Sequence, residues 1–182
     1  MVKENTELMA EARESLSGNW GLAIATFLVY GIIISIFQVI PTVGPVLVLF
    51  IAGPMLVGIS MFSLSLSRGE NARLEQIFEG FKNYSTVLGA YLLMVVLILL
   101  WMLLLIIPGI IAAIAYSQTF YILAEDDAIS SMDALKKSKE MMDGYKWKYF
   151  CLGLRFIGWA LLCILTLGIG FLWLSPYIQI SY

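Results

Sequence analysis

Few side chains in this sequence could do chemistry, and the most unusual of them is an arginine. The chain contains no histidine, so a Ser-His-Asp triad and histidine-bound metals are excluded. Arg155 is a single charge within a long apolar stretch. Buried charges in apolar membrane segments are costly and commonly functional, so Arg155 is a candidate site for an anionic group or an ion pair. The structural interpretation is that its long side chain reaches the membrane interface.

A run of three acids follows another apolar stretch and supplies the candidate partners of Arg155. Glu125, Asp126 and Asp127 are expected near the same edge as the arginine. Adjacent acids without a second set of ligands are weak support for a divalent cation site, so neither a metal nor a cofactor is predicted. The same acids could simply precede a helix that starts at Ser130.

Uncharged polar residues gather in the later part of each apolar stretch. Ser117, Gln118 and Gln179 complete the candidate intramembrane polar site with Arg155. One interpretation is a polar vestibule that opens to the cytoplasm and is lined by the second helix of each hairpin. The other is hydrogen bonding between helices, worth about 0.6 kcal/mol each. Both interpretations place the second helix of each hairpin inside the protein and the first against lipid.

The spacing of charges defines the elements that carry these residues. Of 182 residues, 60% are hydrophobic and 13% charged, about half the charged share of roughly 25% in soluble domains. No charge occurs in residues 15–67, 83–124 or 156–182. Since about 20 helical residues cross a bilayer, the first two stretches can cross twice. The third stretch, 147–182, is barely long enough to cross twice. The sequence therefore predicts an all-α polytopic membrane protein with about six transmembrane helices in three hairpins.

Turn residues near the middle of each stretch mark where the hairpins bend. They are Pro41–Pro45, Pro108-Gly109 and Thr166–Gly170. All 13 acidic residues, and every basic residue except Arg155, lie in the N-terminal segment and the two connectors. The positive-inside rule puts these segments in the cytoplasm. Their charges largely cancel, so no nucleic-acid partner is expected.

A threefold repeat is visible along the chain. Gly18, Gly80 and Gly144 each end a charged segment, and an aromatic residue soon opens an apolar stretch. The predicted units of this single membrane domain are 1–67, 68–127 and 128–182.

Each unit is expected to begin with a short cytoplasmic amphipathic helix. Leu74, Ile77, Phe78 and Phe81 share one face at helical spacing. Ser130 is the expected N-cap of another such helix. These helices either lie along the inner membrane surface or cap the bundle.

Several ordered motifs resemble a bacterial integral membrane family catalogued as domain of unknown function 975. They are Ser17–Gly21, Ile107–Ile111, Ala115–Asp126, Ala134–Ser138 and Leu165–Tyr177. The resemblance implies a multi-span protein of the bacterial inner (cytoplasmic) membrane and supplies no activity or functional residues. Family members continue past this point, and residues 171–182 are too few to cross a bilayer. The third unit is therefore expected either to be truncated or to end at the lipid interface, where a partner would cover it.

The expected function is that of a non-enzymatic membrane module for assembly, stress response or partner binding. The alternative is a small transporter or channel that uses the polar vestibule. An enzyme is not expected, because the apolar segments hold no paired acids or zinc motif. The expected partners are the lipid bilayer and another membrane protein or a second copy of the chain.

Overall fold

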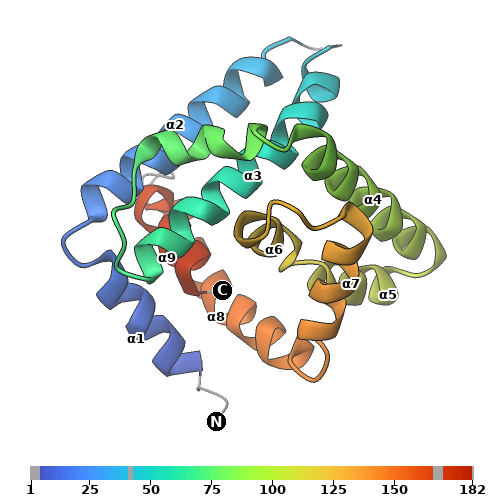
Figure 1. Cartoon of the computed structure of the whole chain (residues 1–182). Helices are drawn as coiled ribbons and strands as arrows, with labels where there is room; N and C mark the ends of the chain where they lie inside the picture. Colours follow the sequence, from blue (N-terminus) through green and yellow to red (C-terminus); the bar gives the residue numbers. More distant parts are fainter. Residues whose placement is uncertain (1–4, 41–42, 166–169, 182) are drawn as a thin grey trace.

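The computed structural model describes residues 5–40, 43–165 and 170–181, and these are helical without any β-strand (Figure 1). The prediction of an all-α protein is confirmed. The helices are α1 (Asn5–Leu16), α2 (Trp20–Gln38), α3 (Gly44–Ser67), the 3₁₀ helix η1 (Leu74–Phe81), α4 (Tyr84–Leu104), α5 (Ile106–Ala115), α6 (Thr119–Glu125), α7 (Ser131–Met141), α8 (Lys146–Leu165) and α9 (Phe171–Ser181).

Four segments of the described chain are long and apolar enough to cross a membrane. They are α2, α3, α4 and the continuous stretch Ile106–Glu125, which contains α5 and α6. Within the described residues the third predicted pair, α8 and α9, does not meet these conditions, so six spans are not confirmed. Helix α9 has 11 residues, about 17 Å of helix. Helix α8 has 20 residues and carries Lys146, Lys148 and Arg155.

The second hairpin bends three residues earlier than predicted. The break is Leu105, whose backbone is extended (φ −162°, ψ 139°), and α5 begins at the next residue. Pro108 is tolerated inside α5 because first-turn N–H groups have no intrahelical acceptor. Gly109 brings the two helices together, since a Cβ there would lie 2.4 Å from Cγ of Met102. Residues 41–42 and 166–169 of the other two predicted breaks lie outside the described residues.

The two helices of a hairpin differ strongly in burial. In the first hairpin, 11% of the apolar window of α2 is buried, against 56% of that of α3. In the second hairpin, the corresponding shares are 11% for α4 and 33% for Ile106–Glu125. The prediction that the second helix faces the protein interior is confirmed for these two hairpins.

The connector helix η1 packs much more closely on α3 than its amphipathic pattern predicted. A Cβ at Gly58 would lie 2.0 Å from the carbonyl oxygen of Ile77, and one at Gly80 would lie 2.0 Å from that of Pro54. Only glycine at both positions permits this backbone contact. The helix is a 3₁₀ helix that crosses the middle of α3, rather than a surface α-helix. The predicted cap of α7 is confirmed, because the amide of Asp133 donates to the Ser130 hydroxyl at 3.2 Å.

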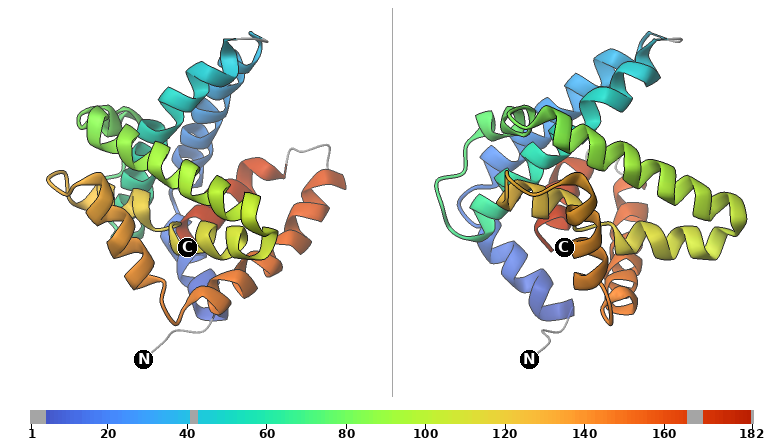
Figure 2. Two further views of the ribbon diagram at one scale, coloured as in Figure 1. Left: turned by 90° about the vertical axis from the view of Figure 1, so that its right-hand side faces the viewer. Right: turned by 45° about the vertical axis from the view of Figure 1, so that its right-hand side comes forward.

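Contacts between helices follow a recurring order along the chain. The connector helices α1, η1 and α7 contact α9, α3 and α6, respectively. The helices α2, α4 and α8 contact α9, α3 and α5, respectively. The hairpins α2–α3 and α4–α5 project from the body in different directions (Figure 2).

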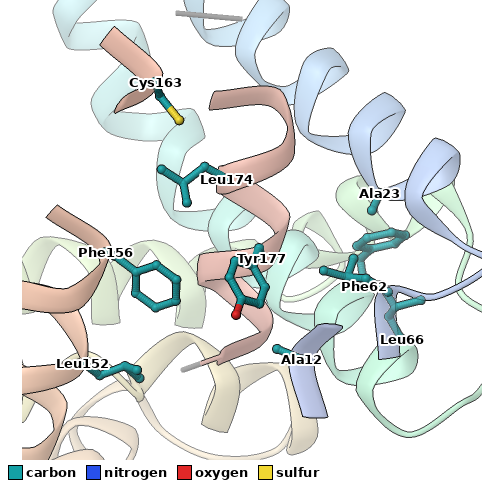
Figure 3. Close-up of a cluster of buried hydrophobic side chains, with 10 residues drawn as sticks. Ala12, Ala23, Phe62, Leu66, Leu152, Phe156, Cys163, Leu174 and Tyr177 are labelled. Atoms are coloured by element: carbon teal, nitrogen blue, oxygen red, sulfur yellow. The ribbon is translucent and has the colours of Figure 1, made fainter. Parts of the chain in front are cut away.

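A buried cluster joins the two ends of the chain (Figure 3). Ala12 and Leu16 of α1 pack there with Phe62 of α3 and with residues of α8 and α9. The Tyr177 ring meets the Phe156 ring edge-on, with 5.5 Å between centroids. The Tyr177 hydroxyl donates to the carbonyl oxygen of Met9 at 3.1 Å, which ties α9 to α1.

Candidate functional site

A cavity of about 280 Å³ lies where α3, α6 and α9 converge, and we call it the central cavity. Gln118 and Gln179, two of the predicted site residues, both line it. The full lining is Ser63, Leu64, Ser67, Gln118, Tyr121, Ile122, Glu125, Met141, Gln179 and Ile180. Except for Met141 of α7, these residues come from the second helix of each hairpin or from the turn before α6.

One wall of the central cavity is formed by a break in a helix. Residues 116–118 separate α5 from α6, and Gln118 is the N-cap of α6. The hydroxyl of Ser138, which is fully buried on α7, donates to the carbonyl oxygen of Ala115 at 2.9 Å. The break is stabilised because a side chain replaces the lost intrahelical donor, and a buried backbone carbonyl requires such a partner.

Ser117, another predicted site residue, belongs to this break and does not line the central cavity. Its hydroxyl donates to the carbonyl oxygen of Ile114 at 2.8 Å, and the Thr119 hydroxyl donates to that of Tyr116 at 2.8 Å. Both hydroxyls therefore satisfy local backbone acceptors. The role of Ser117 in the structure is to stabilise the turn that positions Gln118.

The wall of the central cavity includes a buried hydroxyl without a partner among the described residues. Ser63 is 2% exposed, and its Oγ has no hydrogen-bond partner among the described residues. A buried hydroxyl without a partner costs about 1–3 kcal/mol. Two other lining residues are joined by a hydrogen bond, which the Tyr121 hydroxyl donates to the carbonyl oxygen of Gln179 at 2.8 Å.

The central cavity does not continue along α3 toward the hairpin tip. Ser60, one turn deeper than Ser63, does not line it and donates to the carbonyl oxygen of Leu56 at 2.9 Å. Val57, Ile122 and Leu123 form a buried apolar cluster at this level. The cavity is therefore closed on that side by packed apolar side chains.

Two further cavities adjoin the central cavity around the end of α9. A cavity of about 500 Å³ shares Ser67 and Ile180 with it, and one of about 300 Å³ shares Gln118 and Met141. Glu11, Glu14 and Glu70 are the charged residues of the larger one, whereas the smaller one contains Lys148. The space around the central cavity thus extends to the connector helices α1 and α7.

The structure places Arg155 apart from the acids that were its expected partners. Arg155 is exposed on α8, does not line the central cavity and makes no ion pair with the described residues. Glu125 instead pairs with Arg68, which follows α3 directly. The Asp126 carboxylate accepts from the Ala128 amide at 3.0 Å, and the Asp127 carbonyl accepts from Nδ2 of Asn83 at 3.0 Å.

Sequence reasoning missed Arg68, which pairs with the cavity-lining Glu125 but does not itself line the central cavity. A signal was available, because Arg68 and Glu125 are each the first charged residue after an apolar stretch. In the described residues, no three His, Cys, Asp or Glu side chains are grouped closely enough to hold a metal ion.

These features define the class: an all-α protein with four apolar segments of membrane-spanning length in its described residues and a cavity lined by both polar and apolar side chains. The chain belongs to the family described as Protein of unknown function (DUF975), whose profile matches residues 1–112 and 101–182, and the predicted membership is confirmed. No curated protein and no solved structure matches the chain.

Proposed function

We propose that the chain is one membrane domain of three hairpin units, 1–67, 68–127 and 128–182, with six helices in the bacterial cytoplasmic membrane. The recurring contacts of the connector helices with α9, α3 and α6 support the repeat. Each connector helix packs on the second helix of the preceding unit, and α1 of the first unit packs on α9 of the third. Helices α8 and α9 then form the third pair. The N-terminus and the charged connectors lie in the cytoplasm.

Thiol labelling tests this orientation. In a chain with Cys151 and Cys163 replaced by alanine, Lys82→Cys is expected to react with a membrane-impermeant reagent from the cytoplasmic side only. Val46→Cys, which is 53% exposed near the start of α3, is expected to react from the opposite side only. Reaction of Val46→Cys from the cytoplasm would overturn the topology.

We propose that the protein is a non-enzymatic partner-binding module whose central cavity is a vestibule open to the cytoplasm. The observation that carries this proposal is that Ser63, Gln118 and Gln179, one residue from each hairpin, line one cavity. The apolar cluster of Val57 and Ile122 below it favours a binding site over a pore.

A small transporter is the second candidate. The observation that favours it is the break between α5 and α6, because discontinuous helices commonly form the substrate sites of transporters. In that case the apolar cluster of Val57, Ile122 and Leu123 separates during transport, and the central cavity becomes accessible from the non-cytoplasmic side of the membrane.

Accessibility of Gln118→Cys separates the two candidates. If the central cavity is a binding vestibule, Gln118→Cys is expected to react with an impermeant thiol reagent only from the side at which Lys82→Cys reacts. It should also react more slowly in native membranes, where a partner is present, than after purification into liposomes. Reaction from both sides would favour the transporter. Ser60→Cys is the matched control and should remain unreactive, and an unreactive Gln118→Cys would contradict the vestibule.

A further inference from the structure

A fourth cavity lies on the outside of the helix bundle, between α2, α8 and α9, and we call it the outer groove. Its volume is about 290 Å³. Trp20, Trp159 and Trp173 line it together with Leu174 and Tyr177. Trp159 and Trp173 are 49% and 50% exposed, so the groove opens outward, away from the central cavity.

One charged residue, Arg13 of α1, lines the outer groove. Its guanidinium carbon lies 5.9 Å from the centroid of the Tyr177 ring. That ring is held in place by its hydrogen bond to α1 and its contact with Phe156. Arg13 is exposed and has no carboxylate partner among the described residues. Its neighbours Glu11 and Glu14 line the 500 Å³ cavity instead.

The outer groove runs along α9, and the exposed Arg13 lies at its Tyr177 end. Leu174 lies one turn from Tyr177, and Gly170 lies a further turn away, so the groove follows about 10 Å of helix. Figure 3 shows Cys163, Leu174 and Tyr177 arranged in this order toward α1. With the proposed orientation of the chain, the Arg13 end is at the cytoplasmic interface.

We propose that the outer groove binds an anionic phospholipid of the cytoplasmic leaflet. The guanidinium of Arg13 contacts the phosphate, for which its planar set of donors is well suited. An acyl chain lies over the tryptophans and Leu174. A lipid fits better than a peptide, because the described lining residues include no carboxylate, amide or second cation to hold a peptide backbone. The proposal rests on the proposed membrane orientation and does not depend on the vestibule.

Quenching of tryptophan fluorescence by brominated lipids tests the proposal. Trp101 and Trp147 are replaced by phenylalanine, so that the measured fluorescence comes from Trp20, Trp159 and Trp173 of the outer groove. The protein is reconstituted with either brominated phosphatidylglycerol or brominated phosphatidylcholine. We expect phosphatidylglycerol to be preferred by about fivefold in relative binding constant, as for a partly exposed charge pair. Arg13→Gln should bring this preference close to one.

Arg155→Gln is the matched control, because Arg155 is also exposed near the membrane but lies outside the outer groove. This variant should keep the preference, and Arg13→Lys should keep more of it than Arg13→Gln. Size-exclusion profiles and helix content must match the parent. A preference that persists in Arg13→Gln, or that disappears equally in Arg155→Gln, contradicts the proposal. The orientation labels at Lys82 and Val46 report separately, so failure of the groove is distinguishable from failure of the topology.

Discussion

Replacing Gly58 by alanine is expected to disrupt the fold. The new Cβ would lie 2.0 Å from the carbonyl oxygen of Ile77, and both groups belong to backbones that cannot rotate away. Separating η1 from α3 should cost more than the 1–3 kcal/mol typical of overpacking. Thermal unfolding of the purified protein in detergent should show a large fall in melting temperature, or the protein should elute as an aggregate.

The same interface offers a second variant and a matched control. Gly80→Ala places its Cβ 2.0 Å from the carbonyl oxygen of Pro54 and should have a similar effect. Because both changes separate the same pair of helices, the double variant should be little worse than either single one. Gly31→Ala on α2 has no atom within 4 Å of its Cβ and should be neutral or slightly stabilising. A parent-like melting temperature for Gly58→Ala would show that η1 does not cross α3 as described.

Replacing Ser138 by valine is expected to destabilise the protein by about 1–3 kcal/mol, the cost of an unsatisfied buried acceptor. Valine has a similar shape but cannot donate to the carbonyl oxygen of Ala115, which lost its helical donor at the break between α5 and α6. Denaturation of the purified variant should show this loss. Because the break positions Gln118, labelling of Gln118→Cys should also become faster in the Ser138→Val background.

Ser35→Ala is the control for the loss of a serine hydroxyl. Ser35 is exposed on α2 and donates to the carbonyl oxygen of Gly31 within its own helix, at 2.7 Å. That carbonyl keeps its helical N–H donor, so this change should have little effect. Equal stability of Ser138→Val and Ser35→Ala would show that the break needs no donor from α7.

Much of the secondary structure could be predicted, because hydropathy and capping act over short distances. The starts of α2 and α4 at Trp20 and Tyr84, and the cap at Ser130, follow from residues within one or two turns. The position of the second bend was missed by three residues. Proline is compatible with the first turn of a helix, so Pro108 indicated a nearby helix start and not the break itself.

The candidate site was predicted in part. Gln118 and Gln179 line one cavity because polar residues in a membrane helix avoid lipid and therefore face the same interior. Ser117 was grouped with them but turns toward its own backbone. The pairing of Arg68 with Glu125 joins residues from different hairpins. The positions of the charged residues in the sequence do not specify which acid an arginine contacts.

The sequence by itself determined the class of this protein, because an apolar stretch free of charge has a length that can be compared with a bilayer. It also determined which helix of each of the first two hairpins faces inward, because polar side chains mark that helix. The tertiary structure decided that η1 lies across α3, that α1 is tied to α9, and that Arg13 rather than Arg155 faces an apolar groove. These arrangements depend on close contact between segments far apart in the chain, and a local pattern of hydropathy contains no information on which surfaces will meet.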